Sequence, residues 1–228
     1  RWKGTRMAEA PSESRSVRPL QCREIWGGIE AAREAVSVPG MDVFVRSEPV
    51  GGAAAGGDVH YVGLCGHGML SRFIVADVAG HGEQVAEVAG DLRAIMRQYM
   101  NTPDQSALAA AINDEFAELG AEGMFATAVA ATYHAGSDHL IVVNAGHPRP
   151  LWYRAGERQW HLLEHTLPES ERELADLPLG ILPATGYRQF AVHLQRGDVV
   201  VMYTDSLTEV ADAAGTQLGE SGLLRLAT

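Results

Sequence analysis

The run Phe73-Ile-Val-Ala-Asp77-Val-Ala-Gly80-His81-Gly82 is the stretch around which this chain is expected to fold. Apolar and small residues lead into an aspartate, a glycine-rich turn follows, and an amphipathic helix is predicted directly after it. A carboxylate at the end of a buried strand is costly without a partner, so a cation is its natural counterpart. Asp58 and Asp205 stand in similar settings. The sequence therefore raises the question of whether three carboxylates meet.

The elements around this run predict an α+β fold rather than a parallel alternation of strands and helices. Two helices are inserted between runs of strands, which is typical of an antiparallel β-sandwich with helices outside. The apolar periodicity predicts helices at 22–36, 83–100, 103–119 and from 218 onward, and strands at 41–50, 59–65, 70–78, 124–133, 140–144, 151–153, 160–163, 189–194 and 198–203.

The chain is expected to form a single domain over residues 21–228. Residues 1–20 are rich in Arg, Ser, Glu and Pro, which is typical of a tail or linker. Residues 51–57 are all Gly or Ala and predict a flexible loop that delivers Asp58. Residues 164–186 are polar, contain three prolines and predict a surface excursion, a common form of functional flap.

Composition excludes several classes of partner. Lys and Arg number 18 against 29 Asp and Glu, a net charge of -11, so a basic nucleic-acid footprint is absent. The same charge disfavours an anionic membrane surface, and no stretch reaches the roughly 18 apolar residues of a spanning helix. The 2 cysteines form no CxxC pair. We therefore expect a cytoplasmic protein without nucleic-acid or membrane partners.

Asp58, Asp77 and Asp205 share one pattern, an aspartate beside small residues at a strand end. Hard divalent cations such as Mg²⁺ and Mn²⁺ take carboxylate oxygens as ligands. Two such ions polarise a phosphoryl oxygen and generate a hydroxide nucleophile, which indicates a phosphatase without a covalent enzyme intermediate. For each aspartate alone, a turn or N-cap role is the competing interpretation. Their joint occurrence favours the metal site.

Other catalytic patterns fit less well. His67, His81 and His147 have no helical metal-binding spacing, so loop histidines that hydrogen-bond the backbone are expected instead of a zinc site. The glycine run at 51–57 lacks the Lys-Ser/Thr ending of a phosphate-binding loop. No GxSxG nucleophile elbow occurs.

Five motifs stand in order along the chain. They are Gly56-Gly57-Asp58, Asp77-Val-Ala-Gly-His-Gly82, Phe125-Ala-Thr-Ala128, Asn144-Ala-Gly-His-Pro148, and Gly197-Asp198 with Tyr203-Thr-Asp-Ser-Leu-Thr-Glu209. With these motifs, the chain over about residues 22 to 227 resembles the SpoIIE-type (stage II sporulation protein E) branch of the metal-dependent PPM serine/threonine phosphatases, relatives of protein phosphatase 2C. The resemblance implies an antiparallel β-sandwich flanked by helices (α-β-β-α), with a two-metal site at one end.

By this resemblance, four residues hold two Mn²⁺ or Mg²⁺ ions. Asp77 matches the aspartate that bridges both metals, and Val78 matches the position that gives a backbone carbonyl to one of them. Asp205 matches a ligand of the second metal, and Asp58 matches the acidic position that holds metal-bound water. Thr127 and the turn from Asn144 to His147 match core and site-lining positions.

The resemblance also implies an activity and partners. A water bound to two metals hydrolyses phosphoserine or phosphothreonine, and known members commonly act on STAS-domain anti-sigma-factor antagonists in bacterial partner switching. A catalytically weak phosphatase fold acting as a binding module is the main alternative, and a hydrolase of small phosphoesters is a third. A homodimer joined through the helix at 22–36 is also open. Arg46 is a candidate for the phosphate-binding arginine from its strand position.

The chain departs from the family pattern at three places. Ser206 stands where a glycine is usual, which is expected to tilt the loop after Asp205. Val59-His60-Tyr61 stands where many relatives carry an aromatic and a further acidic residue. No counterpart of the last-strand aspartate occurs before Thr228, so either the domain is truncated before its last strand, as we expect, or the second metal site lacks a ligand.

Overall fold

The structure is a computed structural model that describes residues 17–21, 24–65, 68–79, 83–119, 123–165 and 175–228. Within these ranges the predicted α+β sandwich is confirmed. The large sheet has the order β11-β8-β7-β6-β5-β2, and every neighbouring pair is antiparallel. Its strands are β2 (Ile25–Glu30), β5 (Ala55–Cys65), β6 (Leu70–Val78), β7 (Ala126–His134), β8 (His139–Ala145) and β11 (Gln189–His193).

Two small sheets form the second layer of the sandwich. One has the order β1-β3-β4 and the other β10-β9-β12. Their inward side chains pack with one face of the large sheet in a core that includes Val36, Val62, Phe73, Val129 and Leu140. The strands are β1 (Arg18–Pro19), β3 (Ala32–Val38), β4 (Met41–Ser47), β9 (Leu151–Arg154), β10 (Gln159–Leu162) and β12 (Val199–Val201).

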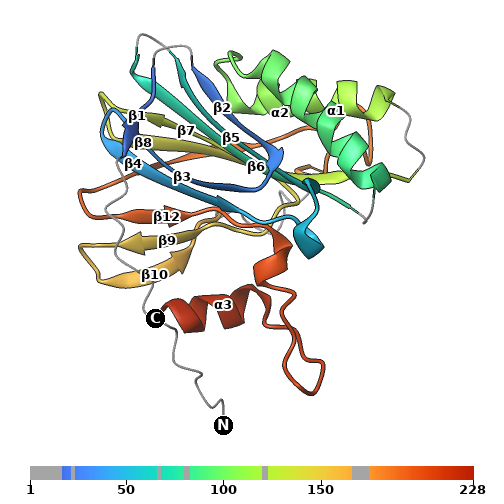
Figure 1. The fold of residues 1–228 in the computed structure, drawn as a ribbon. Helices are drawn as coiled ribbons and strands as arrows, with labels where there is room; N and C mark the ends of the chain where they lie inside the picture. Colours follow the sequence, from blue (N-terminus) through green and yellow to red (C-terminus); the bar gives the residue numbers. More distant parts are fainter. Residues whose placement is uncertain (1–16, 22–23, 66–67, 80–82, 120–122, 166–174) are drawn as a thin grey trace.

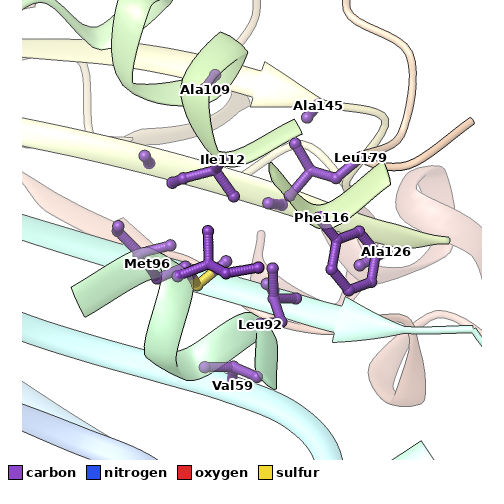
Figure 2. Packing of buried hydrophobic residues seen from close by; sticks show 14 of the residues in the cluster. Val59, Leu92, Met96, Ala109, Ile112, Phe116, Ala126, Ala145 and Leu179 are labelled. Atoms are coloured by element: carbon purple, nitrogen blue, oxygen red, sulfur yellow. The ribbon is translucent and has the colours of Figure 1, made fainter. Parts of the chain in front are cut away.

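Helices α1 (Glu83–Tyr99) and α2 (Gln105–Glu118) cover the other face of the large sheet (Figure 1). Their apolar stripes meet small residues of β6, β7 and β8, as Figure 2 shows for Phe116 beside Ala126. The Asp104 side chain caps α2 by accepting a 2.8 Å hydrogen bond from the Ala107 amide. A third helix, α3 (Gly219–Ala227), contacts β10 of the second layer.

The helix predicted at 22–36 is wrong, because its described part forms β2 and β3. β2 pairs with β5 and β3 pairs with β4. Gly27 lies at φ 142, and a Cβ there would sit 2.0 Å from the His60 carbonyl oxygen, so the close strand pairing requires glycine. The helix on which a dimer contact was predicted is therefore absent from the described residues.

Three predicted loop boundaries also shift. Residues 17–20 of the predicted tail belong to the domain, because Arg18–Pro19 pairs with β3 and Leu20 is buried. The glycine run is partly strand, since β5 begins at Ala55. In the described part of the predicted surface excursion, Leu179 is buried and bridges Ala126, so this segment packs on the core.

No helix in the described part of the chain is long and apolar enough to cross a membrane.

We predict that Leu92→Ala lowers the free energy of unfolding by about 2–5 kcal/mol, because it leaves a cavity between α1 and the large sheet. Leu92 is fully buried. The measurement is chemical denaturation. The adjacent exposed residue supplies the control, Asp91→Ala, which is expected to stay within about 0.5 kcal/mol of the wild type. Equal effects of the two substitutions would contradict the packing described for α1.

Candidate metal centre

The structure brings the three predicted aspartates together at one end of the sandwich. Asp58 on β5 and Asp77 on β6 are direct partners in the antiparallel register. Side chains directly opposite each other lie on the same face of a sheet, with Cβ atoms about 4.5–5.5 Å apart. Asp205 opens the short 3-10 turn Asp205–Leu207 that follows β12. The Asp77 carboxyl lies within hydrogen-bonding reach of both Asp58 and Asp205.

The carboxyls in this cluster resist being charged together. Burial, followed by the negative charges of Asp58 and Asp205, raises the pKa of Asp77 from 3.8 to about 8. Burial also raises the pKa of Asp58, against a 3.2 Å hydrogen bond from the Thr204 hydroxyl to Asp58 Oδ2. A bound cation would remove this repulsion and let the carboxyls ionise.

Gly57 lies beside both oxygen donors predicted around Asp77. A Cβ added at Gly57 would lie 3.4 Å from Asp77 Oδ1, 3.2 Å from the Val78 carbonyl oxygen and 3.0 Å from Val85 Cγ1. The carboxylate and the carbonyl predicted as ligands therefore border the same backbone position, where a side chain would crowd them.

The donor set is partial rather than closed. Within the described ranges, no three or more His, Cys, Asp and Glu side chains are grouped so that they could hold a metal ion by themselves. Mg²⁺ usually keeps several waters and takes only one or two carboxylates from the protein. The oxygen donors present fit Mg²⁺ or Mn²⁺ and, with no histidine or cysteine among them, do not fit zinc.

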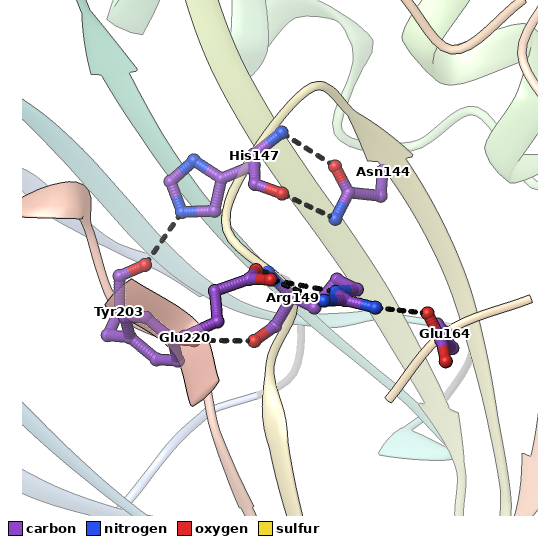
Figure 3. Close-up of polar contacts among 6 residues, drawn as sticks. All are labelled: Asn144, His147, Arg149, Glu164, Tyr203 and Glu220. Atoms are coloured by element: carbon purple, nitrogen blue, oxygen red, sulfur yellow. Dashed lines mark hydrogen bonds and ion pairs between the residues drawn. The ribbon is translucent and has the colours of Figure 1, made fainter. Parts of the chain in front are cut away.

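A turn beside the aspartates places His147 in the interior. The His147 amide donates to Asn144 Oδ1 at 2.7 Å, and Asn144 Nδ2 donates to the His147 carbonyl at 2.9 Å (Figure 3). These two bonds close the turn after β8. The His147 ring is consequently buried at a fixed position, with 5% of the residue exposed.

Both ring nitrogens of His147 are used within the protein. Nε2 donates to the Tyr203 carbonyl at 2.9 Å, so Nδ1 is the acceptor for the Thr127 hydroxyl at 2.8 Å. Thr127 pairs with Asp77 in the sheet, and Tyr203 precedes Asp205 by two residues. His147 thus connects the strand beside Asp77 to the loop that carries Asp205. The loop-histidine interpretation is confirmed for His147, whereas His67 and His81 lie outside the described residues.

Two neighbours of Asp205, Thr204 and Ser206, make hydrogen bonds at the centre that the sequence did not predict. Thr204 donates to Asp58, and the Ser206 hydroxyl lies 3.1 Å from that of Thr204. Ser206 has no positive φ, so the side chain in place of glycine causes no backbone strain. Adjacency to Asp205 was the available signal for both residues. Asp198, which belongs to a quoted motif, instead accepts hydrogen bonds from Trp152 Nε1 and two backbone amides.

A cavity of about 440 Å³ adjoins the centre between β4 and β12. Its wall is mainly apolar, with Asp58 and Thr204 among its lining residues. Arg46 also lines it, but the Arg46 guanidinium bonds Glu48 at 2.8 Å and is 68% exposed. Arg46 as the phosphate-binding residue therefore stays a prediction.

Comparisons with known proteins agree with this geometry. The sequence model of the family described as stage II sporulation protein E (SpoIIE) matches residues 68–228. Phosphoserine phosphatase RsbU of Bacillus subtilis (strain 168) is 30% identical over 86 residues, which are 38% of this chain and 23% of RsbU.

Two solved structures share the fold. The RsbU and RsbW domains of a Mycobacterium tuberculosis protein give a TM-score of 0.63 at 22% identity, covering 91% of this chain and 52% of that one. The PP2C phosphatase domain of SpoIIE from Bacillus subtilis, with a fragment of its regulatory domain, gives 0.57 at 15% identity, covering 82% and 47%. The chain thus spans about half the length of each solved chain.

We predict that stability falls between pH 6.5 and pH 4 partly through His147. Burial lowers the pKa of His147 from 6.5 to about 4, so the unfolded state binds the proton first as the pH falls. Stability from the neutral imidazole is therefore complete above 6.5 and is lost on going down to about 4. The measurement is the melting temperature against pH for the wild type and His147→Gln. The difference in melting temperature between the two proteins should shrink as the pH falls from 6.5 to 4. A constant difference would contradict the lowered pKa of His147.

We predict that Asp77→Asn raises the melting temperature of the metal-free protein. Because the folded-state pKa of Asp77 is raised to about 8, the wild type loses stability as the pH rises from about 4 to about 8. The neutral amide avoids that loss. Melting curves in EDTA at several pH values should show a gain that grows with pH. Added Mn²⁺ should raise the melting temperature of the wild type and leave that of Asp77→Asn unchanged. A larger Mn²⁺ effect on Asp77→Asn than on the wild type would contradict a cation site at Asp77.

Proposed function

Since the chain belongs to the stage II sporulation protein E (SpoIIE) family, we propose that it is a metal-dependent protein serine/threonine phosphatase. The observation that carries the proposal is the meeting of Asp58, Asp77 and Asp205 at one end of a PP2C-like sandwich. Divalent cations bound among three neighbouring carboxyls would offset their mutual repulsion, which gives this otherwise unfavourable arrangement a function.

We assign four residues to two Mn²⁺ or Mg²⁺ ions. Asp77 would contact both ions, the Val78 carbonyl would contact one, and Asp205 would contact the other. When bound, the ions supply Lewis-acid polarisation of a phosphoryl oxygen and a nucleophilic water at neutral pH. Asp58 would orient that water with its carboxylate. The Thr204 hydroxyl donates to Asp58 Oδ2 at 3.2 Å, which would hold this carboxyl in a fixed orientation toward the water.

The substrate we propose is a phosphoserine or phosphothreonine on a protein. The similarity to an enzyme named phosphoserine phosphatase supports phosphoserine. A fold neighbour in which RsbU and RsbW domains occur together supports a role in partner switching, with a STAS-domain anti-sigma-factor antagonist as the substrate class. The open end of the sandwich, where the aspartates are half-buried, would let a phosphorylated side chain approach.

We predict phosphate release from a phosphoserine peptide with Mn²⁺ or Mg²⁺ and none with EDTA. Asp77→Asn should abolish turnover, because it removes the carboxylate assigned to both ions. The matched control is Asp91→Asn, the same substitution on the exposed face of α1, which should behave like the wild type.

Two comparisons separate this proposal from its rivals. Faster turnover of a phosphoprotein than of p-nitrophenyl phosphate at equal metal concentration supports a protein phosphatase, and the reverse supports a hydrolase of small phosphoesters. Absence of turnover in a folded protein that does bind Mn²⁺ would contradict the proposed phosphatase activity and would support the binding module.

A further inference from the structure

A salt bridge links α3 to the turn that carries His147. Arg149 Nε and Nη2 both donate to Glu220 Oε2, at 2.9 and 2.6 Å, and the Arg149 amide donates to Glu220 Oε1 at 2.6 Å (Figure 3). One carboxylate in the first turn of α3 thus accepts three hydrogen bonds from a single residue. Charge-assisted hydrogen bonds from both the guanidinium and the backbone amide of one residue fix orientation as well as adding energy.

Arg149 has a second acidic partner that is less constrained. Nη1 contacts Glu164, whose side chain is 52% exposed, against 26% for Glu220. The hydrogen bond to Glu220 is the largest cause that raises the pKa of Arg149. Glu220 also accepts a 2.6 Å hydrogen bond from the Arg149 backbone amide, which ties it to the main chain. Glu220 is therefore the partner that sets the position of Arg149.

Arg149 in turn fixes Tyr203. The Tyr203 hydroxyl donates to the Arg149 carbonyl at 2.8 Å, while the Tyr203 carbonyl accepts from His147 Nε2 at 2.9 Å. Tyr203 is 6% exposed, so both bonds lie in the interior. Asp205 follows two residues later. The residues before Asp205 are thus anchored to the same short turn through a side chain and a carbonyl.

The loop after Asp205 ends next to Glu220, the partner of Arg149. The Gly219 amide donates to the Thr208 carbonyl at 2.8 Å, and Leu218 donates to Val210 at 2.9 Å. These bonds close the base of the loop directly before Glu220. Arg149 therefore restrains the loop at both ends, through Tyr203 at its start and through Glu220 at its finish.

From this arrangement we infer that Arg149 and Glu220 are a positioning pair that sets the Asp205 carboxylate against Asp58 and Asp77, so that the placement of α3 governs metal binding. The inference rests on the proposed function, since it concerns how well the same centre binds its cation. Neither residue touches the aspartates. Both act through Tyr203 and the loop that begins at Asp205.

The test compares Glu220→Gln with Glu164→Gln in the same chain. Both substitutions remove one carboxylate charge beside Arg149 and keep the size of the glutamate side chain, but only Glu220 joins α3 to the turn. Loss of a residue that orients a metal ligand typically weakens metal binding 10- to 100-fold. We expect Glu220→Gln to weaken Mn²⁺ binding about tenfold by calorimetry and to lower kcat at limiting Mn²⁺, with KM for the phosphopeptide unchanged. Glu164→Gln should match the wild type.

A local readout separates positioning from general stability. The imidazole Nε2–H signal of His147 in proton–nitrogen NMR reports its bond to Tyr203, and it should shift in Glu220→Gln and stay in place in Glu164→Gln. Arg149→Lys keeps the charge but loses the fork, so it should resemble Glu220→Gln. The double variant Arg149→Lys/Glu220→Gln should bind Mn²⁺ no more weakly than either single variant, because the pair acts as a unit.

Three results would overturn the inference. One is a Glu220→Gln protein with a lower melting temperature but wild-type Mn²⁺ affinity, which would make the pair purely structural. Another is an equal loss of Mn²⁺ affinity in Glu220→Gln and Glu164→Gln, which would make the effect one of net charge. The third is absence of Mn²⁺ binding in the wild type, which removes the proposed function as well and is distinguishable because the first two leave wild-type binding intact.

Discussion

The cross-strand pairing of Asp58 with Asp77 is the constraint on which the rest of the structure depends. Like charges directly opposite each other destabilise a sheet, and Asp205 adds a third carboxyl to the pair. The strands around the aspartates are held by buried apolar side chains. These include Val59, Ala76 and Ala128, which occupy positions next to the cluster. Local instability at the aspartates is thus offset by an apolar core on both faces of the central strands.

The second constraint is that one of the three aspartates comes from outside the large sheet. Asp58 and Asp77 are fixed by backbone pairing, whereas Asp205 depends on a turn after β12. Side-chain hydrogen bonds supply what the sheet does not. His147 and Thr204 connect that turn to β7 and β5, and burial keeps the His147 imidazole neutral, so that its donor and acceptor serve different partners. Backbone pairing in the sheet therefore positions two of the aspartates, and side-chain hydrogen bonds position the third.

Local patterns predicted the central strands, α1, α2 and the three aspartates, because each carries its own signal. Alternation marks strands, three- and four-residue steps mark the helices, and small residues beside an aspartate mark the strand ends. The helix predicted at 22–36 failed because steps of four residues are also even steps, so Ile25 and Ile29 share one face of a strand as well as of a helix. The pairing of β2 with β5 then decided the outcome.

The supporting network could not be predicted in the same way. Glu220 lies 71 residues from Arg149 in the chain, and Tyr203 lies 56 from His147. No short-range pattern marks which of many glutamates or tyrosines will meet a given turn. Only the packing of the β10-β9-β12 sheet and α3 beside the large sheet brings these side chains together.

The register of β5 against β6 has a consequence for how errors in folding would be seen. Side chains alternate between the two faces, so a slip of one residue in this hairpin would turn one of the two aspartates toward the helices and leave the other behind. On the proposed assignment of Asp58 and Asp77 to metal ions, cation binding would therefore report the alignment of the two central strands. A compact chain with a misaligned hairpin would not bind the ion.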